Sequence, residues 1–196
     1  MTELVYPSSP APVYPRPSAG NPGVRRRFSG EMLPLVTPDG QVYGQASREW
    51  IHGRADVLHP VVHLYLLDRY RRFYLQRRSM TKSLYPGLWD TSVGGHVTYG
   101  EGLVEALFRE ASEELGLSAF NPILMGSYIN EVESEKEYSV VYAVIGHPEL
   151  HPDGQEVSEG RWWTFPEIEA SLGSNVFTPS FEREFSQLKD KLLALL

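Results

Sequence analysis

Two pairs of short apolar runs, each interrupted by a polar turn, predict hairpins in the first half of the chain. The first pair, residues 32–36 and 41–45, flanks Pro38-Asp39-Gly40, a tripeptide suited to a tight turn. The second pair, residues 60–67 and 73–78, consists mostly of β-branched, aromatic and aliphatic side chains. The second pair is therefore expected to belong to the core sheet.

A further strand is expected over residues 89–93. It ends at Gly94 and Gly95, where the missing Cβ atoms let the backbone and a ligand come close. Later apolar runs predict three strands, at residues 123–132, 138–146 and 161–165, and two closing helices, at residues 166–172 and 179–195. The predicted class is α/β (α+β), a mixed sheet with helices packed on it.

The clearest helix is expected over residues 103–115. Its apolar side chains recur at spacings of three and four and predict one buried face, formed by Val104, Leu107, Phe108, Ala111 and Leu115. Gly116 follows directly and suits the left-handed conformation in which many helices end.

Length and composition predict a single folded domain over residues 31–196. The chain has 196 residues, and 41% of them are hydrophobic, which is enough for one sizeable core. Residues 1–30 are interpreted as a flexible Pro-rich tail, because residues 7–22 are poor in large apolar side chains. A polyproline ligand for a partner protein is the alternative for this segment.

The overall charge and the absence of cysteine exclude several classes of function. A formal charge of −7 gives no bulk attraction for nucleic acid polymers or anionic membranes. No apolar run approaches the roughly 20 residues of a spanning helix. The first residues lack the pattern of a signal peptide, so the expected compartment is the cytoplasm. Without cysteine there are no disulfides, thiolate metal sites or cysteine nucleophiles.

Three glutamates share the face of the predicted central helix that lies opposite its apolar stripe. At about 100° per residue, Glu110, Glu113 and Glu114 fall within one sector, where like charges repel one another. A hard cation such as Mg²⁺ or Mn²⁺ relieves this repulsion and also bridges to substrate phosphates. The alternative is a solvated acidic face.

Arg109 is placed to organise the start of this helix. It is expected to pair with Glu105 one turn away and with Glu101 two turns away. These pairs would hold the loop of residues 95–102 against the helix. Glu101 also lies near the helix start, where the helix dipole favours a carboxylate.

The spacing of these residues resembles the signature of the Nudix family. That signature reads G-x5-E-x7-R-E-U-x-E-E-x-G-U, where U is an aliphatic residue and x is any residue. Its specified positions are matched by Gly95, Glu101, Arg109, Glu110, Glu113, Glu114, Gly116 and Leu117. Ala111 departs from the preferred larger aliphatic residue, which affects packing rather than chemistry.

The resemblance implies a Nudix α/β/α sandwich, with a mixed sheet between helices, over about residues 31–175. It also implies metal-dependent hydrolysis of a diphosphate linkage in a nucleoside diphosphate derivative or a related organic pyrophosphate. The implied partner is a small-molecule diphosphate, and a homodimer is compatible with the resemblance because several family members dimerise.

The resemblance assigns roles to particular residues of this chain. It implies Mg²⁺ or Mn²⁺ binding by the three glutamates, with Glu110 also a candidate base and the carbonyl of Gly94 a further ligand. Many relatives carry one more carboxylate on a later loop, for which Glu159 is preferred here over Glu156. Two solvated loop carboxylates are the alternative. Arg109 and Glu101 complete the expected catalytic set.

Substrate contacts are expected from a strand end and from the loop before the helix. Arg77 and Arg78 are candidate phosphate ligands, and strand alternation lets only one of them face the site. Surface pairing with acidic residues is the alternative for both. His96 and Tyr99 are further candidates, ahead of His63, although a lone strand histidine or a buried aromatic residue is commonly structural.

Other segments are similar to the Nudix branch related to isopentenyl-diphosphate isomerase. Tyr85-Pro86-Gly87-Leu88-Trp89 and Ser92-Val93-Gly94-Gly95-His96 carry this likeness. The isomerase uses a cysteine in a Ser-Val-Cys-Gly-His segment, and this chain has Gly94 at that position. Isomerase activity is therefore the second hypothesis. A Nudix module that binds a ligand without catalysis is the third.

Overall fold

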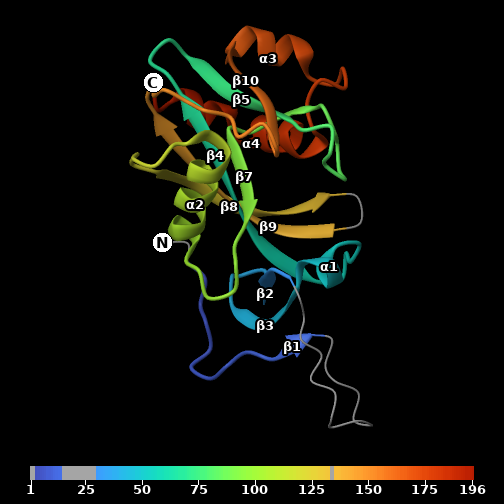
Figure 1. The fold of residues 1–196 in the computed structure, drawn as a ribbon. Coiled ribbons are helices and arrows are strands. Elements are labelled where there is room, and N and C mark those ends of the chain that lie inside the picture. Colours follow the sequence, from blue (N-terminus) through green and yellow to red (C-terminus); the bar gives the residue numbers. More distant parts are fainter. Residues whose placement is uncertain (1–2, 15–29, 133–134) are drawn as a thin grey trace.

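The fold is described from a computed structural model that covers residues 3–14, 30–132 and 135–196 (Figure 1). Its strands are β1 Val13–Tyr14, β2 Met32–Val36, β3 Val42–Ser47, β4 Leu58–Leu67, β5 Arg72–Arg78, β6 Trp89–Asp90, β7 Val93–His96, β8 Ile123–Val132, β9 Glu135–Ile145 and β10 Val157–Thr164. Its helices are α1 Arg48–Ile51, α2 Leu103–Leu115, α3 Phe165–Ser171 and α4 Pro179–Leu193. Within these described residues, no helix is long and apolar enough to cross a membrane.

Strand β4 is the centre of a mixed sheet. It pairs antiparallel with β5 at its C-terminal end and with β7 at residues 61–64. It pairs in parallel with β9 along its whole length. Strands β2 and β3 form the first predicted hairpin, and β4 and β5 form the second. The mixed sheet predicted from the sequence is therefore confirmed.

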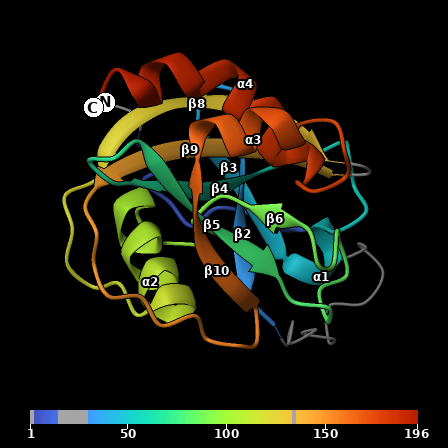
Figure 2. The ribbon, with the colours of Figure 1, turned by 90° about the horizontal axis from the view of Figure 1, so that it is seen from above.

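Helices cover both faces of this sheet, because alternate residues of β4 point to opposite sides. Val62, Leu64 and Leu66 pack in the core beneath α2. Tyr65 and Leu67 pack in the core formed with α4. Figure 2 shows α2 on one side of the sheet and the pair α3 and α4 on the other. The layers are those of the predicted α/β/α sandwich.

Helix α2 begins and ends as predicted, but its buried face is rotated relative to the prediction. It spans Leu103–Leu115, and Gly116 follows with φ 66°. Val104 is 44% exposed, whereas Ala106 is fully buried. Phe108 lies at the edge of the helix and packs on Phe120, with ring centroids 4.4 Å apart. The spacing of three and four fits several rotations of the helix, and contact with the sheet selected one of them.

The predicted strand at 89–93 is two strands. Residues 89–90 form β6, which pairs with β5, and residues 93–96 form β7, which pairs with β4. Ser92 lies where the chain passes from pairing with β5 to pairing with β4. Its hydroxyl donates to the Tyr74 carbonyl of β5 at 2.6 Å and accepts from the Leu66 amide of β4 at 2.7 Å. Gly94 and Gly95 therefore lie inside β7 and do not follow a strand.

The predicted tail of residues 1–30 needs correction over residues 3–14. Strand β1 pairs in parallel with β3, and Ala11 is only 4% exposed. This segment is held by backbone hydrogen bonds and not by a large apolar face. Its composition therefore gave no sign of its structure. The rest of the predicted tail, residues 1–2 and 15–29, lies outside the described residues.

The rotation of α2 can be tested by a pair of substitutions on that helix. Leu107→Ala should lower the free energy of unfolding by about 2–4 kcal/mol, because it leaves a cavity in the core. Val104→Ala should change it by less than about 0.5 kcal/mol, because that side chain is largely exposed. Urea unfolding followed by circular dichroism measures both. Equal losses would contradict the observed rotation.

Candidate active site

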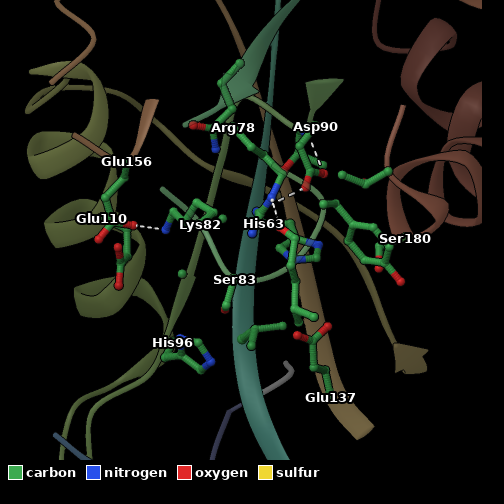
Figure 3. Close-up of a pocket in the computed structure, with 18 of the residues that line it drawn as sticks. His63, Arg78, Lys82, Ser83, Asp90, His96, Glu110, Glu137, Glu156 and Ser180 are labelled. Carbon is green, nitrogen blue, oxygen red and sulfur yellow. Dashed lines mark hydrogen bonds and ion pairs between the residues drawn. The ribbon is translucent and has the colours of Figure 1, made fainter. Parts of the chain in front are cut away.

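A cavity of about 290 Å³ opens between α2, β7 and the loop that follows β5. Figure 3 shows Glu110, Glu156 and Lys82 together near α2, with Asp90 and Ser180 on the other side. His63 projects into the cavity from the central strand β4. The cavity is therefore lined by charged groups of both signs.

Gly95 allows α2 to approach β7 closely at this cavity. A Cβ atom on Gly95 would lie 2.0 Å from the carboxyl carbon of Glu110, a separation that no side chain can adopt. The absence of a side chain thus brings the Glu110 carboxylate directly onto the strand backbone. A side chain at position 95 would therefore displace the Glu110 carboxylate from β7.

Arg109 connects three parts of the site. Its guanidinium donates to Glu101 at 2.8 and 2.9 Å, to Glu110 at 2.7 Å and to Glu113 at 3.3 Å. It also donates to the His96 carbonyl of β7 at 2.9 Å. The predicted pair with Glu101 is confirmed, and it fixes the loop before α2.

The predicted pair between Arg109 and Glu105 is wrong. The Glu105 side chain instead accepts from the Gly102 amide at 2.9 Å and closes the N-terminus of α2. The first-turn backbone donors compete for this carboxylate, and they lie closer than the arginine one turn away.

Glu114 is the most deeply buried of the three glutamates, with an exposed fraction of 3%. Its Oε2 accepts from the Gly94 amide and from the Gln76 side chain, each at 3.2 Å. Burial, followed by the nearby Glu110 carboxylate, raises the pKa of Glu114 to about 8. Burial also raises the pKa of Glu110, against the lowering effect of Arg109. A bound cation would favour the ionised form of both.

Glu156, and not Glu159, lies at the cavity. Glu156 forms an ion pair with Lys82 across the mouth of the cavity. Glu159 lies outside it, with a half-exposed side chain 3.4 Å from Arg77. A bulge in β10 between Val157 and Glu159 shifts the register there, so the preference for Glu159 is corrected.

Arg78 is the member of the arginine pair that faces the cavity. Its guanidinium lies 3.5 Å from Asp90 and donates to the Leu84 carbonyl at 3.0 Å. Arg77 points outward and pairs with Glu159. Alternation along β5 was predicted to admit only one of the two, and pairing of β5 with β10 decides which.

Tyr99 does not line the cavity, in contrast to the prediction. Its hydroxyl accepts from the Ala11 amide at 3.3 Å, and its ring packs edge-on against Tyr6. Its backbone amide donates to the Met32 carbonyl at 2.7 Å. Tyr99 therefore joins the loop before α2 to the N-terminal segment and to β2.

Two of the three histidines that line the cavity, His63 and His96, have pKa values shifted in opposite directions; the third is His52. His96 stacks on His59 with ring centroids 5.3 Å apart, and burial holds the pKa of His96 well below its usual value. His63 contacts Glu184 of α4 through Nδ1 at 2.7 Å. Burial alone would lower the pKa of His63, but Glu184 raises it to about 9. The pKa shifts thus favour the charged form of His63 beside Glu184 and the neutral form of His96.

Sequence reasoning missed Lys82, Asp90 and Glu184. Lys82 carried a usable signal, because it is the only lysine in the first 135 residues and lies between a strand and a Pro-Gly turn. Asp90 reaches the cavity through the pairing of β6 with β5, and Glu184 reaches His63 through the docking of α4. Residue spacing reveals neither contact.

The oxygen donors near α2 fit a divalent cation. Within the described parts of the chain, no three acidic or histidine side chains form a ready-made metal cluster. Arg109 binds Glu110 and Glu113, and Lys82 binds Glu156, so cationic side chains neutralise these carboxylates. Glu110 and Glu114, whose pKa values are raised by burial and by neighbouring glutamates, supply hard oxygen donors of the kind that Mg²⁺ or Mn²⁺ favours.

Comparison with known proteins identifies the family. Residues 57–183 match the model of the NUDIX domain, which covers more than half of the chain. The chain belongs to the Nudix family. Proteins of this family generally hydrolyse pyrophosphate bonds, and the matched residues include the signature from Gly95 to Leu117.

Relatives of this Nudix chain carry two kinds of name. It is 32% identical over 155 residues to "Uncharacterized Nudix hydrolase YfcD" of Escherichia coli, covering 79% of this chain and 84% of that protein. It is 30% identical over 167 residues to "Isopentenyl-diphosphate Delta-isomerase" of Brevibacterium linens, covering 81% and 92%. The crystal structure of DR0079 from Deinococcus radiodurans superposes with a TM-score of 0.71 at 27% identity, covering 81% of this chain and 99% of that one.

The raised pKa of Glu114 predicts a specific pH dependence of stability without metal. A raised pKa in the folded state means that stability is full below the ordinary value near 4.5 and is lost as pH rises through about 8. Glu114→Gln removes this loss. With a chelator present, the free energy of unfolding of the variant, relative to wild type, should rise by at least about 1 kcal/mol between pH 5 and pH 8. This is less than the free energy that corresponds to a shift of one pKa unit.

Urea unfolding at a series of pH values measures this gain. The matched control is Glu113→Gln, which removes an exposed carboxylate from the same helix. If the free energy of unfolding of Glu114→Gln follows that of wild type at a constant difference across this pH range, the raised pKa of Glu114 is contradicted.

Proposed function

We propose that this Nudix protein hydrolyses a diphosphate linkage in a nucleoside diphosphate derivative or a related organic pyrophosphate, with Mg²⁺ or Mn²⁺. The observation that carries the proposal is a pair of carboxylates beside a charged cavity: Glu110 lines the cavity, and Glu114, one turn further along α2, is almost fully buried. Burial is the main cause that raises the pKa of both, and a neighbouring carboxylate adds to it, Glu113 at Glu110 and Glu110 at Glu114. Such an arrangement is costly for a fold and useful for an enzyme that binds a cation there.

In this proposal Glu110, Glu113 and Glu114 hold the metal, with the Gly94 carbonyl and Glu156 as further oxygen donors. When bound, the metal supplies positive charge to the phosphoryl oxygens as negative charge develops on them. The chain itself supplies orientation. Arg109 fixes one oxygen of Glu110, and Glu110 accepts a proton from the attacking water.

The cationic residues of the cavity bind the diphosphate. Arg78 and Lys82 project from β5 and from the loop after it, and both are held at the cavity by acidic partners, Asp90 and Glu156. Lys82 would be released to bind a phosphate if Glu156 bound a metal instead. His63, charged through Glu184, adds a third positive group deeper in the cavity.

Isomerisation of isopentenyl diphosphate is the second candidate function. It is favoured by the likeness to the Brevibacterium linens isomerase and by the imidazoles of His63 and His96 at the cavity. Against it, Gly94 stands at the position of the isomerase cysteine, and the chain contains no cysteine that can move a proton there. A binding module without catalysis is disfavoured because all three signature glutamates are present.

A substrate panel with matched variants tests the proposal. Phosphate or monophosphate release is measured for nucleoside diphosphate derivatives and for isopentenyl diphosphate, with Mg²⁺ or Mn²⁺. Glu114→Gln should lower kcat on the order of 100-fold, because it removes a buried donor. Glu105→Gln, on the same helix but bonded to Gly102, should stay within about twofold. Isomerisation without hydrolysis would favour the second candidate.

The choice between the two loop glutamates gives an independent test. Glu156→Gln should lower kcat on the order of tenfold or more, because Glu156 lies at the cavity. Glu159→Gln should leave kcat within about twofold, because its partner is the outward Arg77. Steady-state kinetics on the best substrate of the panel decides between them, and the reverse ranking would restore Glu159 as the active-site residue.

A further inference from the structure

The N-terminal residues 3–14, called the strap below, cross the β2–β3 hairpin and reach the loop before α2. Val5 exchanges backbone hydrogen bonds with the Gly40 carbonyl at 3.1 Å and the Val42 amide at 2.8 Å. Further along, β1 pairs in parallel with β3. In Figure 1 the strap runs in blue from the side of α2 to β1. It is therefore fixed at both ends to the first hairpin.

Between these two anchors, the strap contacts residues 97–102, called the box loop below. The Tyr6 hydroxyl donates to the Glu101 carbonyl at 3.1 Å and accepts from the Gly100 amide at 3.1 Å. The Tyr6 ring packs edge-on against Tyr99, with centroids 5.5 Å apart. One hydroxyl thus satisfies a donor and an acceptor of the same loop backbone.

The box loop relies on such outside contacts. Its internal hydrogen bonds include those of Thr98 with Glu101, at 2.9 and 3.0 Å. Gly100, with φ 91°, adopts a left-handed conformation that other residues rarely adopt, and its amide donates to the Tyr6 hydroxyl. The Tyr6 hydroxyl therefore holds the backbone of Glu101 together with two further contacts of the loop. The Tyr99 amide donates to Met32, and the Arg109 guanidinium donates to Glu101.

A continuous series of hydrogen bonds leads from Tyr6 to the proposed metal site. Glu101, whose carbonyl accepts from Tyr6, binds Arg109 through its carboxylate at 2.8 and 2.9 Å. Arg109 in turn binds Glu110 at 2.7 Å. A displacement of the box loop would therefore move the guanidinium that orients the Glu110 carboxylate.

We propose that Tyr6 is a positioning residue that holds the Glu110 carboxylate in place through Glu101 and Arg109. The proposal rests on the function proposed above, since it assigns the strap to the same site. The strap precedes residues 57–183, which match the family model, whereas the box loop lies within them. The strap thus adds a support from outside the matched domain.

The test is Tyr6→Phe in the full chain, which removes the hydroxyl and keeps the ring. The Gly100 amide should exchange with deuterium faster than in wild type, because it loses its acceptor. Binding of Mn²⁺ should weaken and kcat should fall, each by about five- to tenfold, the effect of losing one or two hydrogen bonds. KM should remain near the wild-type value, because Tyr6 does not line the cavity.

Tyr43→Phe is the matched control. It removes a tyrosine hydroxyl from β3 of the hairpin that the strap crosses, where the ring contacts Tyr14. The melting temperatures of the two variants should be similar, while Mn²⁺ binding and kcat should fall only in Tyr6→Phe. An equal fall in both variants would assign Tyr6 a merely structural role and overturn the proposal.

Unchanged Mn²⁺ binding and kcat in Tyr6→Phe, with faster exchange at Gly100, would also overturn it. If wild type binds Mn²⁺ but hydrolyses no substrate in the panel, the proposed function fails separately. Amide exchange and Mn²⁺ binding of the two variants would then still decide whether the strap positions the glutamates.

Discussion

Electrostatic repulsion on one face of α2 is the constraint around which this site is arranged, and the guanidinium of Arg109 is the group that contains it. Three glutamates on adjacent turns would destabilise an isolated helix. Arg109 spreads its donors over Glu101, Glu110 and Glu113 and also over a carbonyl of β7. Its planar fork joins loop, helix and strand simultaneously, which the single ammonium of a lysine cannot do.

The sheet supplies the rigidity that this arrangement needs. Alternate residues of β4 enter two separate cores, so the strand is held on both faces. Gly95 then brings the backbone of β7 within reach of the Glu110 carboxylate. Burial against this sheet raises the pKa of Glu110 and Glu114.

What the sequence reveals depends on whether a residue's position is set locally. The bounds of α2 and the spacing of its glutamates follow from helical periodicity and the glycine after it, and both were predictable. The choice between Glu156 and Glu159 depends on a bulge in β10, and that between Arg77 and Arg78 depends on strand pairing. The strap was hidden because its residues bind mainly through backbone groups, which leave little trace in composition.

The parallel pairing of β4 with β9 also governs when the site can form. These strands are joined along ten registered positions, from Leu58 with Lys136 to Leu67 with Ile145, and the chain between them contains α2 and the whole signature. Such non-local pairing requires closure of a long loop and is slow to form. A nascent or partly folded chain can hold the glutamates on a helix and still lack the cavity, so the site should be complete only once β4 and β9 have paired.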